Sequence, residues 1–235
     1  MNGWTPKRFW KEVTVEPAGG GFGVRLDGRV VKTPSKAPLT VPTEAMAREI
    51  AAEWQAQDGV VKPETMPWTR AANSAIDKVT PQFDEVAAML AAYGASDLLC
   101  YRAAHPAALA ERQAAAWDPV LAWAAGWLPE PMVVTAGVMH VTQPPESLVR
   151  LEDRVRGLTP FQLTGLHDLV ALPGSLLLAL AVIDGAVSAE EAWTRARVDE
   201  AWQAEEWGAD EEAAEAEASR RAGFLLAARF YALSR

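Results

Sequence analysis

Strand signals are confined to the first forty residues of this chain, and nearly every strong signal after residue 69 is helical. Apolar and polar side chains alternate from Phe9 to Val15 and again over Phe22-Gly23-Val24-Arg25-Leu26. Asp27-Gly28 separates that second run from Arg29-Val30-Val31-Lys32 and indicates a hairpin, because both turn residues tolerate positive φ. Gly19-Gly20-Gly21 predicts an earlier, looser turn. We therefore expect a small antiparallel sheet at the N-terminus.

A first helix is predicted directly after Pro42. Thr43 suits its N-cap, and Met46, Ile50 and Trp54 recur four residues apart as its buried face.

Later helix starts are marked by capping residues followed by proline or by a glutamate or glutamine. Thr80-Pro81 and Thr159-Pro160 both combine a cap with proline at the first helical position, and Gln162 and Glu191 complete capping boxes with Thr159 and Ser188. These signals predict about seven helices between Thr69 and Arg235. Met132 to Val141 is a β-prone exception.

The predicted fold class is thus α+β. A small β-rich N-terminal domain with one or two helices is expected over residues 1–78, and a larger all-helical C-terminal domain over residues 79–235.

Composition excludes several classes of function. The net charge of −9 over 235 residues argues against binding to nucleic acid or anionic lipid. The single Cys100 excludes an internal disulfide and a cysteine-based zinc site. The most apolar run, Leu169 to Ile183, is shorter than the roughly 20 residues of a membrane span and predicts a buried core helix. Met1 to Val15 lacks the apolar core of a secretory signal, which favours a cytoplasmic location without stable membrane insertion.

No motif for catalysis, phosphate binding or metal binding is found, so we expect no cofactor and no metal. His105, His140 and His167 fall in three separate elements. His167 and Asp168 are neighbours on a predicted helix and should point about 100° apart, away from each other. Ser175 is expected to be an N-cap, and Asp77 to make an intramolecular hydrogen bond or ion pair.

One late segment mixes indole rings with carboxylates. Trp193, Arg197 and Glu200 follow one another at i+4 and i+3, which predicts a common stripe on one helix, and Gln203 and Trp207 continue it. Because no histidine, cysteine or lysine accompanies the carboxylates, we interpret this stripe as a surface that holds a partner.

Nine acidic residues and no basic one lie between Asp199 and Glu217. Such a run is usually a solvated helix face, and the alternative is a docking surface for a basic or partly unfolded protein. The role of the Ala/Glu-rich stretch 209–218 stays open at this stage.

The motifs, taken in order, resemble one known family. They are Phe9-Trp10-Lys11-Glu12-Val13, Leu26-Asp27-Gly28-Arg29, Lys32-Thr33-Pro34, Leu39-Thr40-Val41-Pro42-Thr43, Glu53-Trp54-Gln55-Ala56-Gln57, Met66-Pro67, Ala75-Ile76-Asp77, Leu98-Leu99-Cys100-Tyr101-Arg102, Gln113, Trp117-Asp118-Pro119, Glu200, Gln203 and Trp207-Gly208. The ordered set is similar to the assembly chaperone that binds the α subunit of the F-type ATP synthase.

The resemblance implies a protein without enzymatic activity that holds the new α subunit until the β subunit takes its place in the soluble head. It implies a β-containing N-terminal domain and a helical C-terminal domain. It also implies a functional glutamate at Glu200 and an important tryptophan at Trp54. With Gln203 and Trp207 on the face of Glu200, these four are the expected partner-binding residues.

The competing hypothesis is a small-molecule enzyme with a carboxylate site built from Asp77, Glu200 and one histidine. Such an enzyme needs a deep pocket with perturbed pKa values. An open surface around Glu200 would favour the chaperone.

Overall fold

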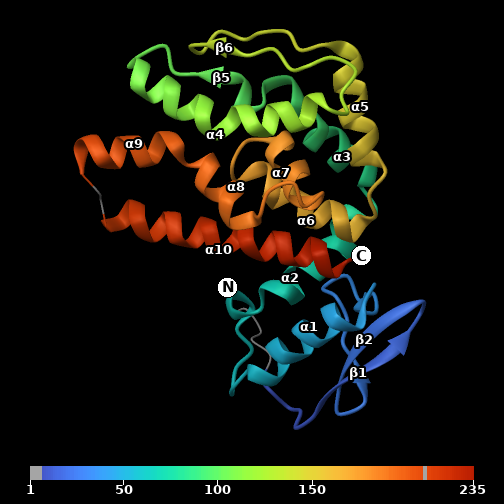
Figure 1. Ribbon diagram of the computed structural model, residues 1–235. Helices are drawn as coiled ribbons and strands as arrows, with labels where there is room; N and C mark the ends of the chain where they lie inside the picture. Colours follow the sequence, from blue (N-terminus) through green and yellow to red (C-terminus); the bar gives the residue numbers. More distant parts are fainter. Residues whose placement is uncertain (1–6, 209–210) are drawn as a thin grey trace. The chain divides into compact units, whose positions relative to one another are not determined.

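The computed structural model describes residues 7–208 and 211–235 and divides into two compact units. The first unit comprises Met1–Phe83, Thr159–Thr164 and Phe230–Arg235, and the second comprises Asp84–Leu158 and Gly165–Arg229. The α+β class is confirmed, because strands form much of the N-terminal part and helices most of the remainder (Figure 1). The domain boundary at residues 78 and 79 stays a prediction.

The first unit contains a four-stranded sheet formed by β1 (Val13–Ala18), β2 (Gly21–Leu26), β3 (Arg29–Val30) and β4 (Thr40–Val41). The strand β2 pairs with β1 along its whole length and with β3 and β4 at the two ends of its other edge, always antiparallel. The strand β2 is therefore the central strand, and it pairs with all three others.

Both hairpin turns of the sheet use positive φ angles. Asp27 and Gly28 have φ of 47° and 78°, as the hairpin signal predicted. The Asp27 carboxylate accepts hydrogen bonds from the backbone N–H of Lys11 and Glu12, and these bonds lower its pKa. The expected looser turn at the glycines was wrong: Ala18 pairs with Gly21, so Gly19-Gly20 forms a tight two-residue turn.

Two helices complete the N-terminal part of this unit, α1 (Glu44–Ala56) and α2 (Pro67–Ser74). The Thr43 hydroxyl accepts from the N–H of Met46, which confirms the predicted cap. Met46 and Ile50 are fully buried. A 3₁₀ turn (Pro63–Thr65) precedes α2, and a π-helical turn (Ala75–Val79) follows it.

The second unit is helical (Figure 1). Its elements are α3 (Phe83–Ala91), 3₁₀ turns at Ala92–Ser96 and Leu98–Cys100, β5 (Tyr101–Arg102), α4 (Ala107–Ala125), β6 (Thr135–Ala136), α5 (Pro145–Arg156), α6 (Pro160–Ala171), α7 (Leu176–Ile183), α8 (Ala189–Ala196), α9 (Val198–Trp207) and α10 (Glu211–Leu233). Three of these helices, α3, α6 and α10, share residues with the first unit. The strands β5 and β6 pair in parallel.

Not every predicted helix start was correct. The Thr159–Gln162 capping box is present in both directions. Ser188 caps α8, but the Glu191 carboxylate pairs with Arg195. Thr80 is not a cap: α3 begins at Phe83, and the Thr80 hydroxyl donates to the carbonyl of Ala75 in the preceding π-helical turn.

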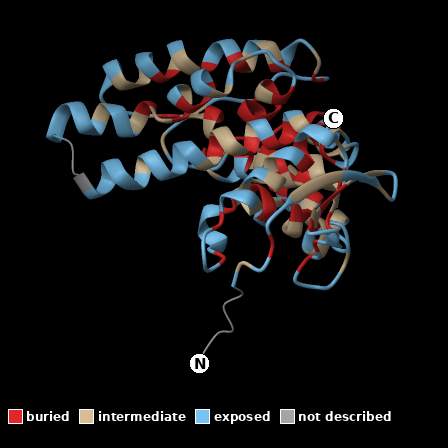
Figure 2. Ribbon diagram, turned by 90° about the horizontal axis from the view of Figure 1, so that it is seen from below, coloured by how far each residue is buried: buried red, intermediate tan, exposed pale blue. Residues whose placement is uncertain are grey.

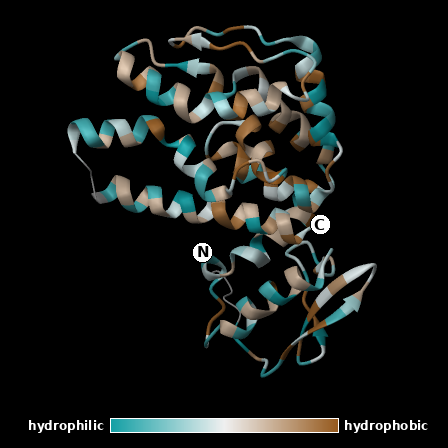
Figure 3. Ribbon diagram, viewed as in Figure 1, coloured by the Kyte–Doolittle hydropathy of each residue, from teal (hydrophilic) through white to brown (hydrophobic). Residues whose placement is uncertain are grey.

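The core of the second unit is α7, of which all residues except Val182 are buried (Figures 2 and 3). The apolar run predicted as one core helix is two, because the chain turns at Pro173-Gly174, where Gly174 has a φ of 77°. Ser175 caps α7 by accepting from the N–H of Leu178, as expected.

A fully buried carboxylate, Asp97, joins the 3₁₀ turn Leu98–Cys100 to the start of α7. It accepts from the Ser175 hydroxyl at 2.7 Å and from the N–H groups of Leu177 and Leu99 at 2.9 and 3.1 Å. Burial raises the pKa of Asp97 to about 6, although these hydrogen bonds act in the opposite direction.

The raised pKa predicts a pH-dependent stability. Because the folded chain holds the Asp97 proton more tightly than the unfolded chain, the contribution of this proton is complete below pH 4 and is lost as pH rises through about 6. An asparagine at this position cannot titrate, so the unfolding free energy of Asp97→Asn should lack this dependence on pH. Urea unfolding of both proteins between pH 4.5 and 7 checks it. A difference in unfolding free energy that stays constant over this range would contradict the assignment.

Candidate protein-binding surface

The predicted stripe of Trp193, Arg197 and Glu200 does not lie on one helix. The chain breaks at Arg197, whose φ of −108° and ψ of 23° end α8 and precede α9, so this expectation was wrong. The side chains still meet across the break. The Arg197 guanidinium lies 5.4 Å from the Trp193 ring centroid, and its Nη2 is 2.6 Å from Glu200 Oε1.

Glu200, Gln203 and Trp207 are all exposed, and the Trp207 residue is 80% exposed. At about 100° per residue, these three positions fall on one face of α9. Val198 and Glu205 fall on the opposite face, and Asp199 lies on the flank between the two faces. The helix therefore has one face available to solvent and another directed at the protein.

The helix α9 is held against α4 by polar contacts. The Gln113 amide Nε2 donates to Asp199 Oδ1 at 2.6 Å, and Arg112 makes two hydrogen bonds of 2.6 and 2.7 Å to Glu205. Gln113 is only 2% exposed, and its Oε1 accepts from the N–H of Ala103 at 2.7 Å. One buried side chain therefore connects α9 to the residue that follows β5.

Arg102 continues this framework along α4. Its Nη2 is 2.5 Å from Asp118 Oδ1, and its guanidinium lies 4.8 Å from the Trp117 ring centroid. The Trp117 indole N–H donates to the carbonyl of Arg195 at 2.7 Å. Arg102, Gln113 and Asp118 belong to the motifs behind the family resemblance, and the sequence alone assigned them no role.

The first unit contains Trp54, the other tryptophan that the resemblance singled out. It has intermediate exposure, and its ring packs edge-on against Trp10 at 5.3 Å between centroids. The structure thus gathers Glu200, Gln203 and Trp207 on α9 of the second unit, while Trp54 packs within the first.

The motif carboxylates and amides of the first unit have structural partners. Glu53 accepts from the N–H groups of Trp68 and Thr69 and so caps α2. Gln57 accepts from the N–H of Lys62. Asp77 accepts from the Thr33 hydroxyl and from the N–H of Ser35, which confirms its expected intramolecular role.

The histidines do not assemble with other potential ligands. No group of three or more His, Cys, Asp or Glu side chains within residues 7–208 and 211–235 could hold a metal ion. His140 contacts the Tyr101 hydroxyl at 3.3 Å. The expected separation of His167 and Asp168 was wrong: their side chains bend together to 2.8 Å, and Asp168 raises the His167 pKa.

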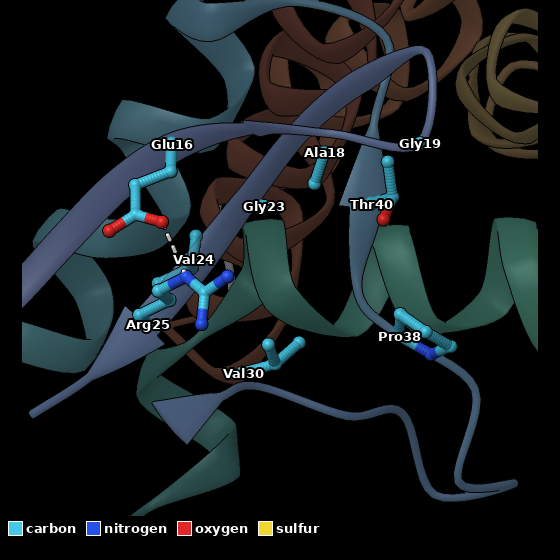
Figure 4. Close-up of a pocket in the computed structure, with 9 residues that line it drawn as sticks. All are labelled: Glu16, Ala18, Gly19, Gly23, Val24, Arg25, Val30, Pro38 and Thr40. Carbon is cyan, nitrogen blue, oxygen red and sulfur yellow. Dashed lines mark ion pairs between the residues drawn. The ribbon is translucent and has the colours of Figure 1, made fainter. Parts of the chain in front are cut away.

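A hollow of about 240 Å³ lies on one face of the sheet in the first unit (Figure 4). Glu16 and Arg25 form an ion pair of 2.6 Å beside it, and Gly23 leaves space that a side chain would fill. The two opposite charges that line this hollow therefore pair with each other.

The described part of the chain contains no helix that is long and apolar enough to cross a membrane.

The helix α9 thus presents an exposed tryptophan beside an exposed carboxylate and an exposed amide. The family model for ATP12 chaperone protein matches residues 7–125. The chain belongs to this ATP12 chaperone family, which confirms the resemblance seen in the sequence motifs.

Solved structures are similar over nearly the whole chain. Atp12 from Paracoccus denitrificans has 53% sequence identity and a TM-score of 0.94, with 97% of this chain and 98% of that chain covered. A mutant of the same protein gives 52% identity and the same TM-score and coverage. The Atu1473 protein of Agrobacterium tumefaciens has 43% identity and a TM-score of 0.91, with 98% of this chain and 86% of that chain covered.

The buried Gln113 amide predicts a linked loss of stability and of α9 order. Gln113→Ala should lower the unfolding free energy by about 1–3 kcal/mol, because the N–H of Ala103 and the Asp199 carboxylate lose their partner. Amide hydrogen exchange in α9 should accelerate. The exposed ion pair serves as control, and Arg112→Ala should lower the unfolding free energy less than Gln113→Ala does. Unchanged exchange in α9 of the Gln113 variant would disprove this role.

Two tryptophans at contrasting sites give a second prediction. Trp54→Ala should lower the unfolding free energy by roughly 3 kcal/mol, since the Trp10 ring loses its neighbour. The matched control Trp207→Ala removes an exposed indole and should change stability by no more than about 0.5 kcal/mol. Denaturant titration measures both, and equal small losses would contradict a packing role for Trp54.

Proposed function

We propose that this chain is a non-enzymatic assembly chaperone that binds the α subunit of the F-type ATP synthase. It protects the subunit interface of α until the β subunit replaces the chaperone. The observation that carries the proposal is the free face of α9, on which Glu200, Gln203 and Trp207 are exposed while other side chains of the helix are anchored to α4. Membership of the ATP12 chaperone family supports it. The proposed location is the cytoplasm.

The chemistry of this face suits a temporary partner. An isolated α subunit exposes a surface meant for its neighbour, and large apolar patches of that kind aggregate. Tryptophan is a frequent anchor at protein interfaces, and charges at the rim tune association rate and selectivity more than affinity. Trp207 is the proposed anchor, and Glu200 the proposed rim charge.

Glu200 can exchange its partner at little energetic cost. Its side chain is 49% exposed, and its ion pair with Arg197 is therefore worth no more than about 1 kcal/mol. An arginine of the client can replace Arg197 in this proposal. The exposure of Glu200 also argues against the carboxylate enzyme, which needs a desolvated acid or base. Asp77, the other proposed carboxylate, is engaged by Thr33 and Ser35.

Charge reversal at Glu200 tests the proposal. Glu200→Lys should weaken the capture of purified α subunit and its protection from aggregation, while the unfolding free energy changes by no more than about 1 kcal/mol. Gln203→Ala and Trp207→Ala should share the defect, because they alter the same face. Co-purification and light scattering during α-subunit refolding measure the effect.

Glu146→Lys is the matched control, because it reverses an exposed helical glutamate on α5 and changes the net charge equally. It should capture the α subunit like the parent. If Glu200→Lys protects the client fully, or if both variants lose the same capture, the free face of α9 is not the binding surface.

A further inference from the structure

The β-prone segment identified in the sequence exposes a second apolar surface on the second unit. Among the described residues, ten large hydrophobic side chains are exposed, and Val133, Val134, Val138 and Met139 are four of them. Val138 is 96% exposed and Met139 is 78% exposed. Two of these side chains precede β6 in the sequence and two follow it, all within seven residues. The four are called the apolar strip below.

Hydrogen bonds hold the apolar strip in this exposed conformation. The buried Gln143 amide accepts from the N–H of Val133 at 2.8 Å and donates to its carbonyl at 3.0 Å, as a neighbouring strand would. The N–H of Gly137 donates to the carbonyl of Arg102 at 2.8 Å. The strip is therefore built and anchored to present apolar side chains to water.

The apolar strip differs chemically from the free face of α9. No Asp, Glu, Lys or Arg occurs from Pro131 to Pro145, although 23% of all residues are charged. Valine offers stiff apolar contacts, and methionine adapts to irregular partner surfaces. In addition, β6 pairs with β5 alone among the described strands, and a strand with one partner can be joined by an extended segment. Both features fit an extended, uncharged, apolar segment of a protein.

The buried Gln113 amide connects the strip to α9. Its oxygen accepts from Ala103, the residue after β5, and its nitrogen donates to Asp199 of α9. Figure 1 shows β5 and β6 along one side of α4, with α9 on the other side. A single client can therefore engage both surfaces, each attached to the same helix.

We propose that the apolar strip is a second client-binding surface that takes an extended, uncharged apolar segment of the α subunit. The proposal rests on the proposed function and adds the surface that recognises apolar chain. The α subunit is the proposed occupant because a client that must be shielded before assembly supplies exposed apolar surface. A membrane is disfavoured, because the net charge of −9 repels anionic lipid.

Aspartate substitutions in the strip test the proposal with the full chain. Val138→Asp and Met139→Asp should leave the thermal midpoint unchanged, since both side chains are exposed. Each should weaken capture of purified α subunit about tenfold, because a carboxylate is desolvated against an apolar segment. Val149→Asp is the matched control: Val149 is 58% exposed on α5 of the same unit, and the change in charge is identical. It should capture the α subunit like the parent.

A photo-crosslinking amino acid in place of Met139 identifies the occupant directly. Crosslinks to the α subunit support the proposal, whereas crosslinks to a second copy of this chain alone overturn it. If the parent captures the α subunit and both strip variants capture it equally well, the strip proposal fails and the proposed function stands. If the parent captures no α subunit, the proposed function fails and the strip proposal fails with it.

Discussion

The side-chain amide of Gln113 is the contact that joins α9, which carries the first proposed surface, to the backbone after β5. It is buried and simultaneously accepts from the backbone after β5 and donates to the Asp199 carboxylate. A glutamate here could accept from Ala103 but would repel Asp199, and a leucine would satisfy neither group. Only a side chain that is donor and acceptor at once fits both partners. Together with the Arg112–Glu205 pair, the bond from Gln113 to Asp199 holds α9 against α4.

Identical chemical groups have opposite roles in this chain because their surroundings supply different numbers of donors. The carboxylates of Glu53, Asp77 and Asp97 each accept at least two hydrogen bonds from backbone or hydroxyl groups and so join segments distant in sequence. Glu200 has one arginine partner and remains accessible to solvent. Most of the motif residues thus build the framework, and this contrast separates Glu200 from them.

The sequence predicted those features that depend on neighbouring residues. The Asp27-Gly28 turn and the caps at Thr43 and Ser175 follow from the backbone angles and hydrogen bonds that these residue types favour locally. The break at Arg197 and the Gln113 network were not predictable in this way. Periodicity continues across the break, since Arg197 still reaches Trp193 and Glu200, and the partners of Gln113 lie 10 and 86 residues away. The sequence also did not predict the exposure of the apolar strip, because a run such as Val133-Val134 usually predicts a buried strand.

Two modest surfaces, one on α9 and one flanking β6, suit the proposed chaperone, which must release its client. A single large apolar interface would bind tightly and dissociate slowly, whereas two linked contacts combine through effective concentration and can be broken one at a time. The acidic face of α9 responds to salt and to competing charges, while the uncharged strip does not. An incoming β subunit would then need to displace only one contact to weaken the other. The separation of a polar helix face from an apolar strip, both anchored through α4, gives the proposed release a physical route.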